Sequence, residues 1–262
     1  MTLATVLVGV VVLGVLLVVN VLGGSNQALR DPAEPVPAEL ATGRTLGKAD
    51  APVKMDVWED FQCPNCDTFS SGIEPRLVNQ FVRGGTVQIT YHDFLVIDRN
   101  GSHESLDAAV AARCALDQDK FWLYSQYLFA NQGPVENGGT FTKSLFDAIA
   151  TRMGLNVATF DACLADPATA AAVQAEAAEG QQKGVSGTPA VFVNGEQRPN
   201  YSLTALTADI EAAAKGEPLP GSSGAPGASS SAPPESTLPP ESPAAPATES
   251  PAPAAPAASP TP

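Results

Sequence analysis

Alternating apolar and polar residues predict a β-α-β unit in the first half of the chain. The alternation runs through residues 53–58 and again through residues 87–92, which is the period of a β-strand. Between these strands, every fourth residue is apolar on one helix face, at Phe69, Ile73, Leu77 and Phe81. We therefore predict a helix over residues 66–82, which Gly72 and Pro75 are expected to kink or interrupt.

Helical spacing then replaces the strand pattern. From residue 102 to about residue 183, apolar side chains recur at helical intervals and no strand pattern interrupts them. We therefore expect a helical insertion at about residues 98–183. Beyond it, an apolar run at residues 190–193 ends at the hairpin dipeptide Asn194-Gly195, and residues 203–210 predict a closing helix. The whole pattern is that of an α/β frame interrupted by a helical block.

A long apolar run opens the chain. No charged residue occurs between Leu3 and Leu22, and about 20 residues at about 1.5 Å each span the ~30 Å hydrocarbon layer of a membrane. The run is long for a signal peptide, and no basic segment precedes it. We predict a transmembrane anchor at residues 1–24, in the membrane through residues 3–22; the alternative is a cleaved signal peptide.

Two proline-containing segments flank the predicted domain, which we place at residues 44–216. Residues 25–43 are polar and contain Pro32, Pro35 and Pro37, a composition typical of a semi-extended tether. Residues 217–262 consist mainly of Pro, Ala, Ser, Gly and Thr. Because such a segment buries too little apolar surface to offset the entropy of ordering, we predict a disordered tail.

Charge and length narrow the class of protein. The 262 residues suffice for one sizeable domain with appendages. The net charge of -14 argues against a nucleic-acid partner, because the phosphates would repel the chain. Protein partners are expected instead.

Cys63 and Cys66 form a Cys-X-X-Cys motif at the junction between the first strand and the first helix. The first amides of a helix lack intrahelical acceptors, and the macrodipole adds positive charge there, so both stabilise a thiolate at Cys63. In such motifs the pKa of the leading thiol can fall from about 8.5 to about 3.5–7. We predict Cys63 as nucleophile and Cys66 as resolving thiol, with no metal or cofactor. The alternatives are half of a zinc site and two unrelated core cysteines.

A second pair of cysteines lies in the predicted helical block. Cys114 and Cys163 each occupy the apolar face of a predicted helix, so both thiols are expected to point into one small core. We predict a structural disulfide between them; two buried free thiols and a second redox centre are the alternatives. Four thiols in such positions suit an oxidising compartment, so we expect the globular part to lie outside the cytoplasm, on a single-pass anchor in the cell membrane.

Two separated motifs carry a resemblance to a known family. The sequence Asp60-Phe61-Gln62-Cys63-Pro64-Asn65-Cys66 and the later Gly187-Thr188-Pro189-Ala190-Val191-Phe192-Val193 occur in the order found in the DsbA-like branch of the thioredoxin superfamily. The helical block also matches at Asp119-Lys120-Phe121-Trp122. The chain resembles this branch over roughly residues 43–215, which implies a thioredoxin fold with an inserted helical domain.

The resemblance also implies an activity. A DsbA-like chain would introduce disulfides into exported proteins by dithiol–disulfide exchange, and a membrane protein similar to DsbB or to vitamin K epoxide reductase would reoxidise it. Pro189 would be a cis proline beside the cysteines, and the backbone of Thr188 would contact substrate. The alternatives are a disulfide reductase or isomerase, and an envelope binding module without catalysis.

Two departures from the family bear on this expectation. The dipeptide Pro64-Asn65 lacks the histidine of strongly oxidising members, which leaves the direction of the reaction open. Many members place a buried acid where this chain has Val57, so the neighbouring Asp56 and Glu59 become candidates for proton transfer, with a solvated strand-end role as the alternative. Ordinary surface or capping roles are expected for the two histidines, His92 and His103.

Overall fold

The computed structural model describes residues 29–221. The predicted membrane segment at residues 3–22 and nearly all of the predicted tail lie outside this range. Within residues 29–221, no helix is both long and apolar enough to cross a membrane.

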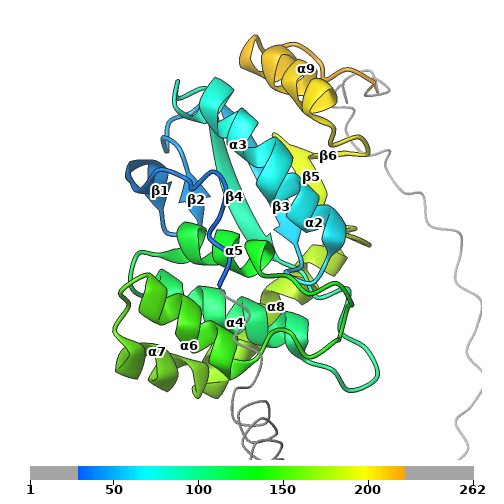
Figure 1. Cartoon of the computed structure of the whole chain (residues 1–262). Coiled ribbons are helices and arrows are strands. Elements are labelled where there is room, and N and C mark those ends of the chain that lie inside the picture. The colour runs from blue at the N-terminus through cyan, green and yellow to red at the C-terminus, as the bar shows by residue number, and fades with distance from the viewer. Residues whose placement is uncertain (1–28, 222–262) are drawn as a thin grey trace, which may run out of the picture. The chain divides into compact units, whose positions relative to one another are not determined.

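A six-stranded sheet forms the frame, in the order β1-β2-β4-β3-β5-β6 (Figure 1). The central strands β3 and β4 are parallel, and Val57 pairs with Tyr91 in their register. β5 runs antiparallel to β3. The strands are β1 (Ala41–Thr42), β2 (Thr45–Leu46), β3 (Val53–Glu59), β4 (Val87–Asp93), β5 (Ala190–Val193) and β6 (Glu196–Arg198).

The first helical run begins at Pro64, two residues before the predicted start, because proline suits the first turn of a helix. It does not break at Gly72 and Pro75. A π-helical turn precedes Pro75, which has no N–H to donate, and the wider turn lets the helix continue. The segments of this run are α2 (Pro64–Thr68), η2 (Phe69–Ile73), α3 (Glu74–Leu77) and η3 (Val78–Val82).

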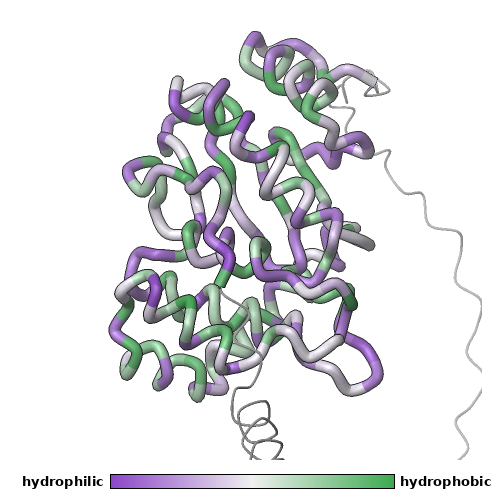
Figure 2. The backbone as a smooth tube through the Cα atoms, in the orientation of Figure 1, coloured by the Kyte–Doolittle hydropathy of each residue, from purple (hydrophilic) through white to green (hydrophobic). Residues whose placement is uncertain are grey.

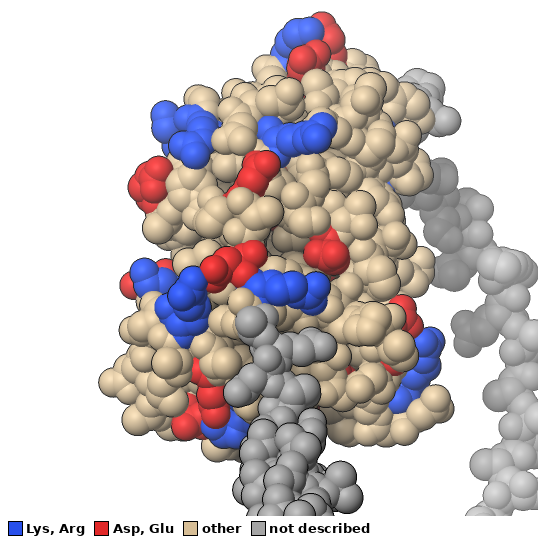
Figure 3. Space-filling model, in the orientation of Figure 1, with Lys and Arg blue, Asp and Glu red and all other residues tan. Residues whose placement is uncertain are grey.

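The predicted helical block consists of five helices, which Figure 1 shows gathered at one end of the sheet. Hydrophobic residues follow the central strands and these helices, whereas hydrophilic residues gather in the loops (Figure 2). Acidic and basic side chains are interspersed on the face shown in Figure 3. The helices are α4 (Glu104–Leu116), α5 (Phe121–Ala130), α6 (Lys143–Arg152), α7 (Val157–Leu164) and α8 (Pro167–Gln182), and the closing helix is α9 (Leu203–Ala214).

The folded part extends beyond both predicted domain boundaries. On the N-terminal side, residues 29–36 lie along α5 instead of forming a free tether, and Val36 is buried. On the C-terminal side, Leu219 is buried, and the carbonyl of Pro220 accepts a hydrogen bond from Arg198. Prolines lose little backbone freedom on docking, which explains why a proline-rich composition did not prevent ordered packing here.

Candidate active site

Cys63 and Cys66 lie at the end of β3, where the chain enters α2. Cys63 is the N-cap residue of α2, and Pro64 occupies the first helical position. Both cysteines are free thiols; Cys63 keeps 5% of its surface exposed and Cys66 keeps none. The amide of Cys66 donates to the Cys63 carbonyl at 3.0 Å. One sulfur therefore reaches the surface while its partner, one turn along, is enclosed.

The two thiols differ in acidity. A hydrogen bond from the Cys66 thiol is the largest influence on Cys63; burial opposes it, the Thr188 side chain assists it, and the pKa of Cys63 falls to about 6. The amides of Cys66 and Asn65 contribute less, because the Cys63 side chain makes no close cap hydrogen bond. Burial, followed by the interaction with Cys63, raises the pKa of Cys66 well above its usual value. Cys63 is thus mostly thiolate at neutral pH, whereas Cys66 stays protonated.

The motif that contains Pro189 lies directly against the cysteines. The Thr188–Pro189 peptide bond is cis. The Thr188 carbonyl oxygen lies 3.4 Å from the Cys63 sulfur. β5 begins at the next residue, Ala190, and pairs with Trp58 of β3. The sheet therefore brings together two motifs that are far apart in the sequence.

The two candidate acids occupy different places. Glu59 is 2% exposed, and its Oε1 has no hydrogen-bond partner. Burial, then the charges of Glu74 and Cys63, raise the pKa of Glu59 well above its usual value. Asp56 lies on the other face of β3 and hydrogen-bonds His92 at 3.0 Å. The structure brings Glu59, but not Asp56, to the cysteine pair.

Neither histidine lies at the cysteine pair. His92 does not project freely from its strand as expected; it stacks on Trp58 with the ring centroids 4.4 Å apart. Its second nitrogen contacts Glu176 of α8 at 2.9 Å, so α8 covers the strand face that the local pattern marked as outward. His103 is the residue before α4 and makes no side-chain cap hydrogen bond. Both histidines therefore belong to the surroundings of the helical block.

Glu74 is a buried acid that the sequence analysis missed. It is 2% exposed, its Oε1 has no hydrogen-bond partner, and burial raises its pKa to about 8. The available signal was spacing: Cys66, Ser70, Glu74 and Val78 recur every fourth residue, and all four are buried. The sequence analysis took Phe69, Ile73, Leu77 and Phe81 as the buried face of the helix, so it did not identify the neighbouring row that contains Glu74.

Asp60 anchors the loop that leads to the cysteines. Its carboxylate accepts hydrogen bonds from the amides of Val96 and Ile97 at 3.0 Å each and from the hydroxyl of Ser105 at 2.6 Å. It also accepts from the amide of Gln62 at 2.9 Å. The carboxylate thus fixes the residues just before Cys63 to the helical block.

The second cysteine pair forms a disulfide apart from this site. Cys114 of α4 and Cys163 of α7 are joined, with their Cα atoms 5.6 Å apart. Cys114 is fully enclosed by the core of the helical block. The bond cross-links two helices of this block.

Comparisons with known proteins agree with this arrangement. A family model described as thioredoxin matches residues 39–212. A probable disulfide bond formation protein D from Bacillus anthracis is 30% identical over 174 residues, which span 65% of this chain and 79% of that protein. The crystal structure of oxidised BdbD from Bacillus subtilis is 25% identical with a TM-score of 0.61, covering 71% of this chain and 100% of that one. Wolbachia pipientis α-DsbA1 shares the fold, with 18% identity and a TM-score of 0.59 over 70% of this chain and 94% of its own.

Proposed function

We propose that the protein works as a membrane-anchored oxidase of exported proteins. The chain belongs to the DsbA-like branch of the thioredoxin superfamily and is a protein thiol–disulfide oxidoreductase. The observation that carries the proposal is the unequal cysteine pair. A thiolate with a pKa of about 6 at Cys63 is a good leaving group, and stabilising it favours the reduced protein. A protein whose reduced form is stabilised gives its disulfide to substrates.

The reaction proceeds through a mixed disulfide. A substrate thiolate attacks the Cys63 sulfur of the Cys63–Cys66 disulfide; the sulfur–sulfur bond breaks and Cys66 leaves as a thiolate that takes up a proton. A second substrate thiolate then attacks the substrate sulfur bound to Cys63. The substrate gains a disulfide, and Cys63 leaves as a stable thiolate. The two electrons taken from the substrate remain on the cysteine pair.

Glu59 is proposed as the acid that gives Cys66 its proton. Burial favours the protonated form of the Glu59 carboxyl, since it raises the pKa of Glu59 well above the usual value. Glu59 also raises the pKa of Cys66, which supports their proximity. A neutral acid beside a newly formed buried thiolate can transfer its proton without exposing either group to water. The Glu59 carboxylate is then reprotonated before the next cycle.

The location is part of the proposal. The Cys114–Cys163 bond supports an oxidising compartment, because structural disulfides are rare in the cytosol. The apolar run at residues 3–22 would hold the domain at the cell membrane, with the domain outside the cytoplasm. Exported proteins with cysteines are the proposed substrates, bound in part by the backbone of Thr188 beside Pro189. A membrane protein of the DsbB or vitamin K epoxide reductase kind is the proposed oxidant of the reduced pair.

The test uses the oxidised full-length protein and a peptide with two thiols. We expect the wild-type protein to oxidise the peptide, Cys63→Ser to abolish the reaction, and Cys66→Ser to retain a Cys63 that can be alkylated. Activity in Cys63→Ser equal to wild type would contradict the mechanism. Equilibration of the pair with glutathione then gives the direction: a pair more reducing than glutathione would contradict an oxidase and favour a reductase.

A further inference from the structure

The side chain of Gln132, just beyond the C-terminal end of α5, contacts the backbone of the active-site loop. Its amide nitrogen donates to the carbonyl oxygen of Phe61 at 2.8 Å and to that of Cys63 at 3.0 Å. These two carbonyls belong to the loop that carries the reactive sulfur. We propose that Gln132 is a positioning residue for thiol–disulfide exchange, holding the Cys63 backbone in the conformation that keeps its thiol reactive.

The backbone of Cys63 lies at the transition from an extended conformation to the helix α2. It is extended, with φ -73° and ψ 120°, and the helix begins at the next residue, so the Cys63 carbonyl points into the first turn of α2. That carbonyl accepts from the amides of Cys66 and Asp67 at 3.0 and 3.1 Å. Gln132 adds a third donor from outside the helix. The sulfur, the carbonyl and the Cys66 thiol are therefore oriented together, and a loop that rotated would separate the sulfur from the groups that lower its pKa.

Gln132 is itself held by residues 29–36, which we call the N-terminal strap. The guanidinium of Arg30 donates to the Gln132 carbonyl at 3.0 Å. The side chain of Asn131 accepts from the Arg30 amide at 2.9 Å and donates to the Arg30 carbonyl at 2.8 Å. The polar contacts thus run from Arg30 through Asn131 and Gln132 to Cys63.

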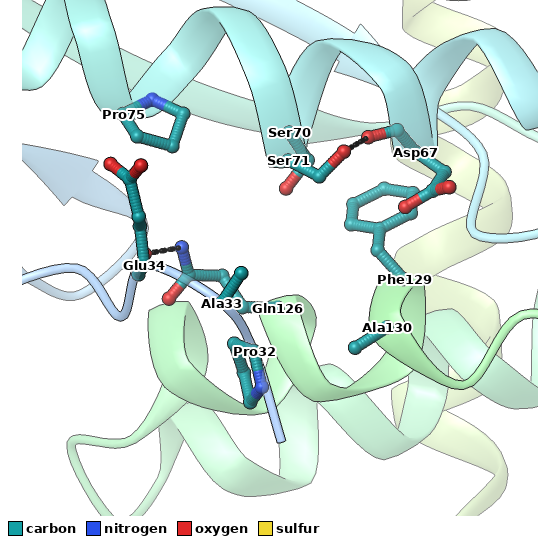
Figure 4. Close-up of a pocket in the computed structure, with 10 residues that line it drawn as sticks. All are labelled: Pro32, Ala33, Glu34, Asp67, Ser70, Ser71, Pro75, Gln126, Phe129 and Ala130. Carbon is teal, nitrogen blue, oxygen red and sulfur yellow. Dashed lines mark hydrogen bonds between the residues drawn. The ribbon is translucent and has the colours of Figure 1, made fainter. Parts of the chain in front are cut away.

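Other contacts keep the strap on α5. Gln126 accepts from the amide of Val36 at 2.9 Å and donates to the carbonyl of Glu34 at 3.1 Å. Figure 4 shows Gln126 and Phe129 facing the first helical run across a small pocket, with strap residues at its edge. Gln126 therefore fastens the strap without touching the cysteine loop, which makes it a matched control for Gln132.

The experiment replaces each glutamine by methionine, which has a similar length, no charge and no N–H donor. The alkylation rate of Cys63 at pH 6 is measured on the reduced full-length protein, together with the equilibrium with glutathione. For Gln132→Met we expect alkylation to slow about two- to fivefold, as the loss of the two hydrogen bonds to the loop would raise the pKa of Cys63. The glutathione equilibrium should shift by a similar factor toward the oxidised pair.

For Gln126→Met we expect a lower melting temperature with an unchanged alkylation rate. If Gln132→Met lowers the melting temperature but alkylates at the wild-type rate, Gln132 only stabilises the fold and the proposal is wrong. Equal slowing in both variants would also overturn it. Should Gln132→Met fail to fold, Gln132→Asn, whose shorter amide cannot reach both carbonyls, is measured with the same expectation. The test follows the reactivity of Cys63 and does not depend on the direction of the net reaction.

Discussion

Carboxyl side chains of low exposure lie on opposite faces of β3, and they differ in the charges around them. On the cysteine side, Glu59 and Glu74 each have an Oε1 with no hydrogen-bond partner. On the other side, Glu176 is bound by His92, Arg44 and Arg113. Glu59 and Glu74 are buried and the Glu176 side chain keeps 11% of its surface exposed, so the neighbouring charges decide which carboxyl ionises.

The pKa values follow from that difference. Burial raises the pKa of Glu176, but hydrogen bonds from His92 and Arg44 and the two guanidinium charges outweigh it and hold the pKa at about 2. Burial alone raises that of Glu74 to about 8. One face of the strand therefore holds a permanent anion that ties α8 to the sheet. The other holds protons beside the cysteines.

The largest effect is expected from Glu176→Gln. It removes the carboxylate that Arg44 and Arg113 share and leaves Asp93 to pair with both arginines. We expect the free energy of unfolding to fall by about 3 kcal/mol, as in other broken ion pairs of low exposure. Urea unfolding at pH 7 measures this change. Glu179→Gln, on the same helix in an exposed pair with Lys183, is the control and should cost less than about 1 kcal/mol. Equal losses would mean that the network at Glu176 has no special role.

A smaller effect, with a distinctive pH dependence, is expected from Glu74→Gln. Since the pKa of Glu74 is about 8 in the folded protein and ordinary in the unfolded chain, the folded state holds the extra proton between these values. The free energy of unfolding of the wild-type protein therefore falls as the pH rises toward 8. The Glu74→Gln variant has no proton to lose at this position and does not show that fall. We expect the variant to gain about 2 kcal/mol over wild type between pH 5 and pH 8.

Denaturant unfolding at the two pH values, with each variant compared with wild type, measures this gain. Glu211→Gln, at an exposed position of α9, is the control, and its difference from wild type should not grow with pH. A Glu74→Gln difference that stays constant from pH 5 to pH 8 would show that Glu74 is ionised in the folded protein.

The smallest effect is expected from Glu59→Gln, and it concerns the rate of disulfide exchange. Without the proposed acid, Cys66 must take its proton from elsewhere, and we expect oxidation of the dithiol peptide at pH 7 to slow about three- to tenfold. Stopped-flow mixing with the oxidised protein measures the rate. Asp56→Asn changes the acid on the opposite face of the same strand and should react at the wild-type rate. Slowing in Asp56→Asn alone would reverse the assignment.

The local pattern of apolar and polar residues was sufficient to predict a helix or strand wherever one face of that element is buried. The alternation in β3 and β4 and the Cys-X-X-Cys at the helix start were evident for that reason. The cis bond before Pro189 was expected only through the family resemblance, since nothing local favours it. His92 was misjudged because alternation says which residues share a face but not that α8 covers the second face. Gln132, which lies 69 residues from Cys63, needs the tertiary fold to be recognised at all.

The docking of the N-terminal strap shortens the distance that the domain can extend from the membrane. The proposed membrane segment ends at Leu22 and the strap is held at Arg30, so seven residues lie between the two and the chain takes eight Cα-to-Cα steps. Even fully extended, such a stretch covers no more than about 28 Å at about 3.5 Å per residue. With the proposed anchor, the side of the molecule that carries Arg30 stays close to the lipid headgroups, and Gln132 connects that side to Cys63. An oxidant embedded in the bilayer could meet the reduced pair there, whereas polypeptides would have to approach along the membrane surface.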